Sequence, residues 1–117
     1  MTFAEVEEAA DYSPEHAILR LQGLYGKYRV LVTELLAGET RKYSYYLLRS
    51  NWVEAGFDNS PDPRAIRLKH GTIGEEHAGE LVPHLHLEDK TRLLLTEEMT
   101  FETFLDWIKT NMPPGES

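Results

Sequence analysis

The chain contains no cysteine. Disulfide bridges and thiolate chemistry are therefore excluded. A single domain of 117 residues can bury about two-thirds of its unfolded surface, so neither a disulfide nor a structural metal is required for stability. We expect one domain over residues 1–117, with residues 1–12 and 112–117 flexible. Any bound metal would then serve function.

Long apolar runs are also missing. Residues 1–8 are acidic and have no apolar centre, which argues against a secretory signal. No later run reaches the length that spans a membrane. We therefore expect a cytoplasmic protein with no membrane partner.

Positive charge is scarce, and the net charge is −8. Broad binding of nucleic acid is disfavoured, because phosphate contacts need clustered lysine and arginine. Residues 41–70 are the exception, with six basic residues against three acidic ones. This segment could receive a polyanion, although a solvated basic edge strand is the more common explanation of such a charge pattern.

The motifs of several enzyme classes are absent. The chain has no phosphate-binding P-loop, no dinucleotide-binding glycine turn, no H-E-x-x-H zinc motif and no nucleophile elbow. Histidines and carboxylates remain as the side chains that could carry chemistry.

The periodicity of the chain predicts an α+β fold, an antiparallel meander sheet of four to five strands covered by an N-terminal and a C-terminal helix. Ser13-Pro14-Glu15 is typical of a helix start, and the apolar residues that follow at helical spacing predict a helix that ends at Gly26. Thr100 predicts the cap of the C-terminal helix. Strands are expected at residues 28–36, 41–48, 52–57, 64–69 and 81–87, with a further short piece at 92–96; loops are expected at residues 58–63 and 70–80.

The segment Pro83-His84-Leu85-His86 is the first candidate site. Side chains alternate along a strand, so His84 and His86 should share one accessible face while Leu85 and Leu87 face the core. Two imidazoles on one face can ligate a single metal or act as an acid–base pair near neutral pH. Two exposed strand histidines are nevertheless more often incidental than functional.

Asp58-Asn59 is the second candidate. A turn held by proline can fix a carboxylate and an amide at a strand end, where sites often lie. The alternative is an ordinary turn whose side chains bond their own backbone. Arg67, Lys69 and His70 follow on the next predicted strand and could help to bind phosphate or substrate.

Four motifs occur in an order that resembles the TumE-type toxin family. They are Tyr43-Ser44-Tyr45-Tyr46, then Val53 to Asn59 ending in Phe-Asp-Asn, then His84-Leu85-His86, then the helix with Phe101, Phe104 and Leu105. The resemblance covers about residues 41–110. The chain differs from many relatives in having Gly56 where they have arginine, and in the 24 residues that separate Asn59 from His84.

The resemblance implies a small prokaryotic toxin of a type II toxin–antitoxin pair, with a helix-turn-helix antitoxin as its partner. Our leading interpretation is a toxin-like protein acting on RNA or a nucleotide-bearing substrate, as a ribonuclease or another phosphate-directed enzyme. In this interpretation, His84 and His86 act as an acid–base pair or as ligands of a divalent metal. Asp58 orients an imidazole or completes the metal site, and Asn59 bonds substrate or the strand end.

Two alternatives come from other classes. One is a non-catalytic binding or assembly module, in which the acidic surface and the tyrosines recognise a partner protein. The other is a metal-dependent enzyme acting on small molecules.

Overall fold

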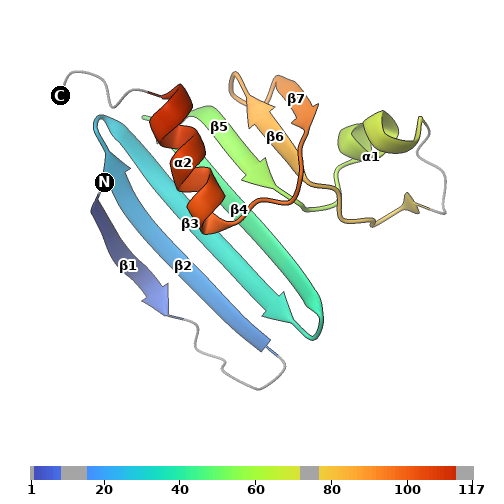
Figure 1. Cartoon of the computed structure of the whole chain (residues 1–117), viewed down its shortest axis with the longest axis horizontal. Coiled ribbons are helices and arrows are strands. Elements are labelled where there is room, and N and C mark those ends of the chain that lie inside the picture. Colours follow the sequence, from blue (N-terminus) through green and yellow to red (C-terminus); the bar gives the residue numbers. More distant parts are fainter. Residues whose placement is uncertain (1, 9–15, 72–76, 113–117) are drawn as a thin grey trace.

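The computed structural model describes residues 2–8, 16–71 and 77–112. Within these residues seven strands form one sheet, and their order in the sheet follows their order in the chain (Figure 1). All neighbouring strands are antiparallel. The strands are β1 (Thr2–Glu8), β2 (His16–Tyr25), β3 (Tyr28–Ala37), β4 (Thr40–Arg49), β5 (Trp52–Asp58), β6 (His84–Leu87) and β7 (Arg92–Leu95); the helices are α1 (Pro63–His70) and α2 (Phe101–Asn111).

The α+β class is confirmed, but the expected number of strands and the N-terminal helix are wrong. Residues 16–25 form β2, which pairs with β3 along all ten of its residues. Gly26, with φ of 58°, lies in the tight turn between these strands and does not end a helix. Leu21, Gly23 and Tyr25 alternate along one face of β2, so this segment satisfies the strand period as well as the helical one.

The N-terminal segment adds another strand. Thr2–Glu8 forms β1 and pairs with β2, where we expected a flexible segment. The expected helix cap Ser13-Pro14-Glu15 lies outside the described residues, as do residues 113–117.

The fourth strand expected at residues 64–69 is the helix α1. Asp62 caps it, with its side chain accepting a hydrogen bond from the Arg64 backbone amide at 2.8 Å, and Pro63 occupies the first turn. Gly71 ends the helix in a left-handed conformation, with φ of 81°. The helix places the neighbouring residues Ala65 and Ile66 in the interior and leaves Arg64, Arg67 and Lys69 exposed.

The other elements lie close to where the sequence predicts them. The strands at residues 28–36, 41–48 and 52–57 are confirmed as β3, β4 and β5, and the piece at 92–96 is β7. The strand expected at 81–87 begins only at His84. Thr100 caps α2 as expected, with its hydroxyl accepting from the Thr103 amide at 3.2 Å.

The sheet is covered on both faces near β5 and β6. On one face α2 packs against the sheet (Figure 1), with Phe104 stacked on Tyr45 and in edge contact with Phe57. On the other face Ala65 and Ile66 of α1 form a small buried cluster with Val82, against which partly buried Leu93 packs. These two layers determine which strand side chains are withdrawn from solvent.

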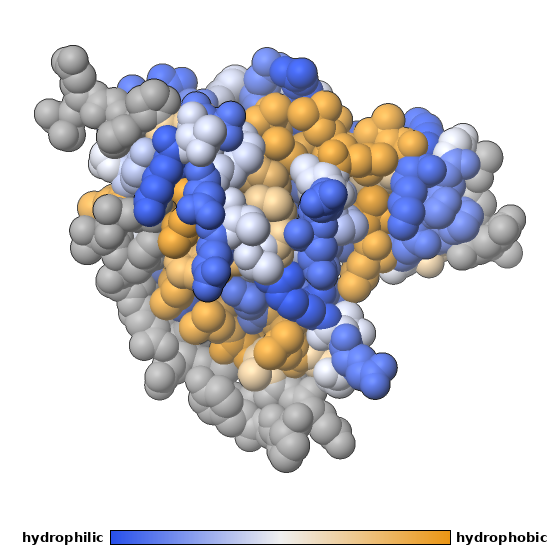
Figure 2. All heavy atoms as spheres, viewed as in Figure 1, coloured by the Kyte–Doolittle hydropathy of each residue, from blue (hydrophilic) through white to orange (hydrophobic). Residues whose placement is uncertain are grey.

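The outer side of α2 is hydrophilic, while apolar side chains gather over β6 and β7 (Figure 2). Leu94 and Leu95 of the edge strand β7 remain 40% and 42% exposed. Among the described residues no helix has the length and apolar character to cross a membrane.

Candidate functional site

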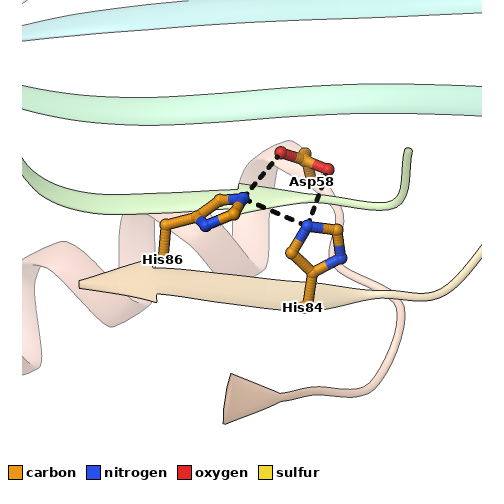
Figure 3. A group of neighbouring side chains, drawn as sticks. All are labelled: Asp58, His84 and His86. Carbon is orange, nitrogen blue, oxygen red and sulfur yellow. Dashed lines mark hydrogen bonds and ion pairs between the residues drawn. The ribbon is translucent and has the colours of Figure 1, made fainter. Parts of the chain in front are cut away.

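Asp58, His84 and His86 meet on one face of the sheet, as Figure 3 shows. Asp58 ends β5 and is the register partner of His84 on β6, while His86 lies opposite Gly56. Residues that are partners, or two apart on one strand, share a face, so pairing of β5 with β6 brings the three side chains together. The sequence prediction that these residues share one site is consistent with this geometry.

The cluster is compact. The Nε2 atom of His84 lies 3.1 Å from Asp58 Oδ1 and 3.1 Å from His86 Nε2. The Nε2 atom of His86 lies 3.4 Å from Asp58 Oδ2. The two imidazole planes are almost perpendicular, at 87°, so that both Nε2 atoms are directed at the same small region.

The expected accessibility of the histidine face is wrong. His84 is 1% exposed, His86 4% and Asp58 6%. Side chains from other segments lie against this face: the Tyr46 ring stacks with His86, and Leu93, the register partner of His86, packs against the cluster of Ala65, Ile66 and Val82. A strand that alternates histidine with leucine can therefore be buried on both faces.

The tautomer of His84 follows from its backbone contact. Its Nδ1 atom lies 2.6 Å from the carbonyl oxygen of Val82. A carbonyl can only accept, so Nδ1 carries hydrogen and donates it. This contact fixes the ring and directs Nε2 at Asp58 and His86.

Asp58 is held from two further sides. The backbone amide of Ser60 donates to Oδ1 at 2.9 Å, and the hydroxyl of Tyr46 donates to Oδ2 at 3.0 Å. Burial alone would raise the pKa of the Asp58 carboxyl, but hydrogen bonds to His84 and His86 outweigh burial and hold that pKa below its ordinary value. Asp58 is thus a buried, ionised carboxylate.

The charge of Asp58 also acts on its neighbours. Burial alone would lower the pKa of the His84 imidazole, but the hydrogen bond to Asp58 and its negative charge raise that pKa above its ordinary value. Burial, together with the charge of Asp58, raises the pKa of the Tyr46 hydroxyl, which therefore keeps its proton and acts as a donor. His84 and Asp58 therefore each favour the charged form of the other.

Asn59 does not join the cluster. Its side-chain oxygen accepts from the backbone amide of Tyr43 at 3.0 Å, and its side-chain nitrogen donates to the carbonyl of Arg41 at 2.8 Å. These bonds extend the pairing with β4 beyond the last residue of β5. Of the two roles considered for Asn59, bonding the strand end is the one seen.

Arg67, Lys69 and His70 lie on α1 and not on a strand. Arg67 and Lys69 are exposed. Lys69 lies 3.6 Å and His70 2.5 Å from the Glu80 carboxylate, and His70 stacks on His77. Among the described residues, His70 therefore belongs to a second cluster, His70–His77–Glu80, that is distinct from the first.

Two neighbours of the cluster were missed in the sequence. The ring of Tyr46 stacks with His86 at a centroid distance of 6.5 Å, and its hydroxyl reaches Asp58. Gly56, the register partner of Tyr46 on β5, makes this possible, because a Cβ atom at position 56 would overlap the Tyr46 ring. A glycine inside a strand was the only signal of such a close approach.

Comparison of the chain with family models, with curated proteins and with solved structures finds no match. The site is therefore interpreted from its own geometry. Two imidazoles and one carboxylate whose ligand atoms lie within 3.4 Å of one another can move a proton or hold a cation.

Proposed function

We propose that this protein is a toxin-like component of a type II toxin–antitoxin pair that acts on RNA or another nucleotide-bearing substrate at the Asp58–His84–His86 cluster. One observation carries the proposal: two imidazole Nε2 atoms and a carboxylate converge within 3.1–3.4 Å of one another in the interior. The proposed reaction is attack of a hydroxyl or a water on a phosphate ester: a new bond forms between the attacking oxygen and phosphorus, and the bond from phosphorus to the leaving alcohol oxygen breaks. The cluster supplies the group that takes up the proton of the attacking oxygen and the group that gives a proton to the leaving oxygen.

The cost of burying these groups supports a chemical role. A charged pair in the interior must overcome the loss of hydration, and an apolar pair of similar size often gives equal or greater stability. The core on the α2 side of the same strands is apolar throughout, with Phe57 and Leu85 beside Asp58 and His86 in the chain. A polar cluster on the other face is therefore not needed to build the sheet.

The surroundings of Asp58 suit a sugar–phosphate group. A cavity of about 160 Å³ opens on the same face of the sheet. Ser44, which lines it, is the register partner of Asp58, and Ser60, which also lines it, donates its amide to Asp58. The residues that line it are Thr33, Leu35, Lys42, Tyr43, Ser44 and Ser60.

Further positive charge stands near the cluster. The Lys90 ammonium lies 5.1 Å from the centre of the Tyr46 ring, and Arg64 donates to the Lys90 carbonyl at 3.1 Å. Arg67 and Lys69, which are exposed on α1, belong with Arg64 to the basic segment 41–70. A phosphate could be received here although the chain as a whole carries a net charge of −8.

Expression in a bacterial host tests the proposal. We expect the wild-type chain to slow growth and the His84→Ala, His86→Ala double variant to relieve that inhibition, because the proposed centre loses both imidazoles. The matched control is His70→Ala, His77→Ala, which removes two histidines from the other cluster and should still inhibit. Equal inhibition by all three proteins at equal soluble amounts, or none by the wild type, rejects the proposed function.

A further inference from the structure

The ligand atoms of the Asp58–His84–His86 cluster have the spacing of a metal's coordination shell. Ligands that bind zinc at 2.0–2.1 Å in a tetrahedron stand about 3.3 Å apart. The separations here are 3.1 Å between the two Nε2 atoms, 3.1 Å from His84 to Asp58 and 3.4 Å from His86 to Asp58. The three side chains need little movement to enclose one cation.

Hydrogen bonds alone cannot pair all the polar atoms of this cluster well. Because His84 donates through Nδ1 to Val82, its Nε2 atom is bare in the neutral ring. A single proton on that nitrogen would have to serve both Asp58 and His86, whereas a proton on each Nε2 atom would set two donors 3.1 Å apart. One cation between the three residues satisfies both nitrogens and the carboxylate together.

The supporting bonds are those that hold metal ligands. A histidine ligand usually donates its second ring nitrogen to a carbonyl or carboxylate, as His84 does to Val82, and a ligating carboxylate is itself hydrogen-bonded, as Asp58 is by Ser60 and Tyr46. His84 and Asp58 are thus oriented before any cation arrives, while the buried Nδ1 atom of His86 has no hydrogen-bond partner among the described residues and its ring is stacked with Tyr46.

The second histidine cluster lacks this geometry. The rings of His70 and His77 lie parallel, with centroids 3.5 Å apart and planes 2° from each other. A ring nitrogen's lone pair lies in the plane of its ring, so two parallel rings cannot both direct a lone pair at one cation. This cluster therefore provides an internal control.

We infer that Asp58, His84 and His86 bind one divalent transition-metal cation, with zinc as the best fit. Imidazole nitrogen and carboxylate oxygen suit zinc, and three protein ligands leave a fourth position, as in catalytic zinc sites. Asp62, whose side chain is 19% exposed, lies nearby with Oδ2 3.9 Å from His84 Nε2. The inference rests on the proposed function and deepens it by naming the cation of the same site. When bound, this cation would activate a water molecule. Cation binding itself can be measured whether or not the protein is a toxin.

Calorimetric titration of the metal-free protein with zinc chloride tests the inference, using protein purified without a histidine tag. We expect one equivalent of zinc to bind to the wild type, and Asp58→Asn, His84→Ala and His86→Ala each to weaken binding about 10- to 100-fold or more. The control His70→Ala, His77→Ala should bind as the wild type does. No binding by the wild type, or binding lost only in the control, overturns the inference.

Cobalt substitution keeps the test decisive if a variant fails to fold, because it uses the wild-type chain alone. Cobalt(II) bound by two imidazoles and a carboxylate with low coordination number should give intense visible absorption that one equivalent of zinc removes. A spectrum equal to that of cobalt in buffer contradicts the inference. Growth inhibition without zinc binding would reject the cation site but not the proposed function. Zinc binding without growth inhibition would reject the proposed function but not the cation site.

Discussion

The position of the Tyr46 ring depends on a single residue, Gly56. The ring lies across the backbone of β5 at this glycine, where a Cβ atom would overlap it. From there Tyr46 stacks with His86 and donates to Asp58. An additional methyl group at position 56 must therefore displace the ring or the strand.

We predict that Gly56→Ala lowers the free energy of unfolding by about 1–3 kcal/mol, as is usual when a packed site is overfilled. Urea denaturation followed by circular dichroism measures it. In a Tyr46→Ala background the same substitution should cost much less, because the overlapping ring is gone. Equal costs in the two backgrounds would show that the ring is not what excludes a side chain at position 56.

The residues of the cluster were predictable from the chain to different degrees. The spacing of His84 and His86 placed them on one face, and the resemblance joined Asp58 to them. Their burial could not be predicted, because it depends on contacts between segments that are far apart in the sequence, such as Tyr46 with His86 and Leu93 with the α1 cluster. The contact of Tyr46 with Asp58 depends on the register of β4 against β5, which a bulge near Leu47 alters and which local pattern does not encode.

At the scale of elements, the turn from β6 to β7 carries conformational strain. Glu88, Asp89 and Lys90 follow one another with φ of 50°, 55° and 70°. This left-handed region is costly for residues with a side chain. Asp89 has a compensating role, since its carboxylate accepts from the Val53 amide at 3.1 Å and its own amide donates to the Val53 carbonyl at 2.9 Å.

We predict that Glu88→Gly raises the free energy of unfolding by about 0.5–1 kcal/mol, because glycine adopts the left-handed conformation without steric cost. Asp89→Gly should be neutral or destabilising, since it relieves similar strain but loses the bond to Val53. Thermal unfolding of both variants beside the wild type provides the measurement. A gain in stability from Asp89→Gly as large as that from Glu88→Gly would show that the Asp89 carboxylate contributes nothing.

Elements were predicted best where caps and turns agreed with periodicity. Thr100 ahead of an apolar helical stripe identified α2, and the Val- and Leu-rich segment before Gly38 identified β3. Residues 64–69 were assigned as a strand because six alternating residues fit either period. The signals that distinguish a helix lie just outside that window, in Asp62-Pro63 at its start and Gly71 at its end.

At the scale of the whole molecule, the buried ion pair makes stability depend on pH. The Asp58 pKa lies below its ordinary value of 3.8, so the pair's contribution is lost as the pH falls below that value. The His84 pKa lies above its ordinary value of 6.5, so the contribution is also lost as the pH rises through the raised pKa. The contribution is therefore greatest between about pH 4 and 6.5.

We predict that the stability difference between the wild type and Asp58→Asn is greatest near pH 5 and decreases on both sides. Urea unfolding of both proteins from pH 3 to 8, with a chelator present to keep the site metal-free, gives the two profiles. Taking the difference removes the titration of all other groups that the substitution leaves unchanged. A difference that does not vary with pH would mean that no ion pair exists between these residues.

The order of the strands bears on when the cluster forms as the protein is made. Strands β2 to β5 are joined by short turns, and each pairs with the strand before it. This part of the sheet can therefore form one hairpin after another. The β5–β6 pairing is different, because it must close a loop that contains α1, and loop closure over a longer segment is entropically less favourable. Asp58 therefore leaves the ribosome well before the histidines that it will hold. The three side chains cannot come together until β6 has emerged and paired with β5.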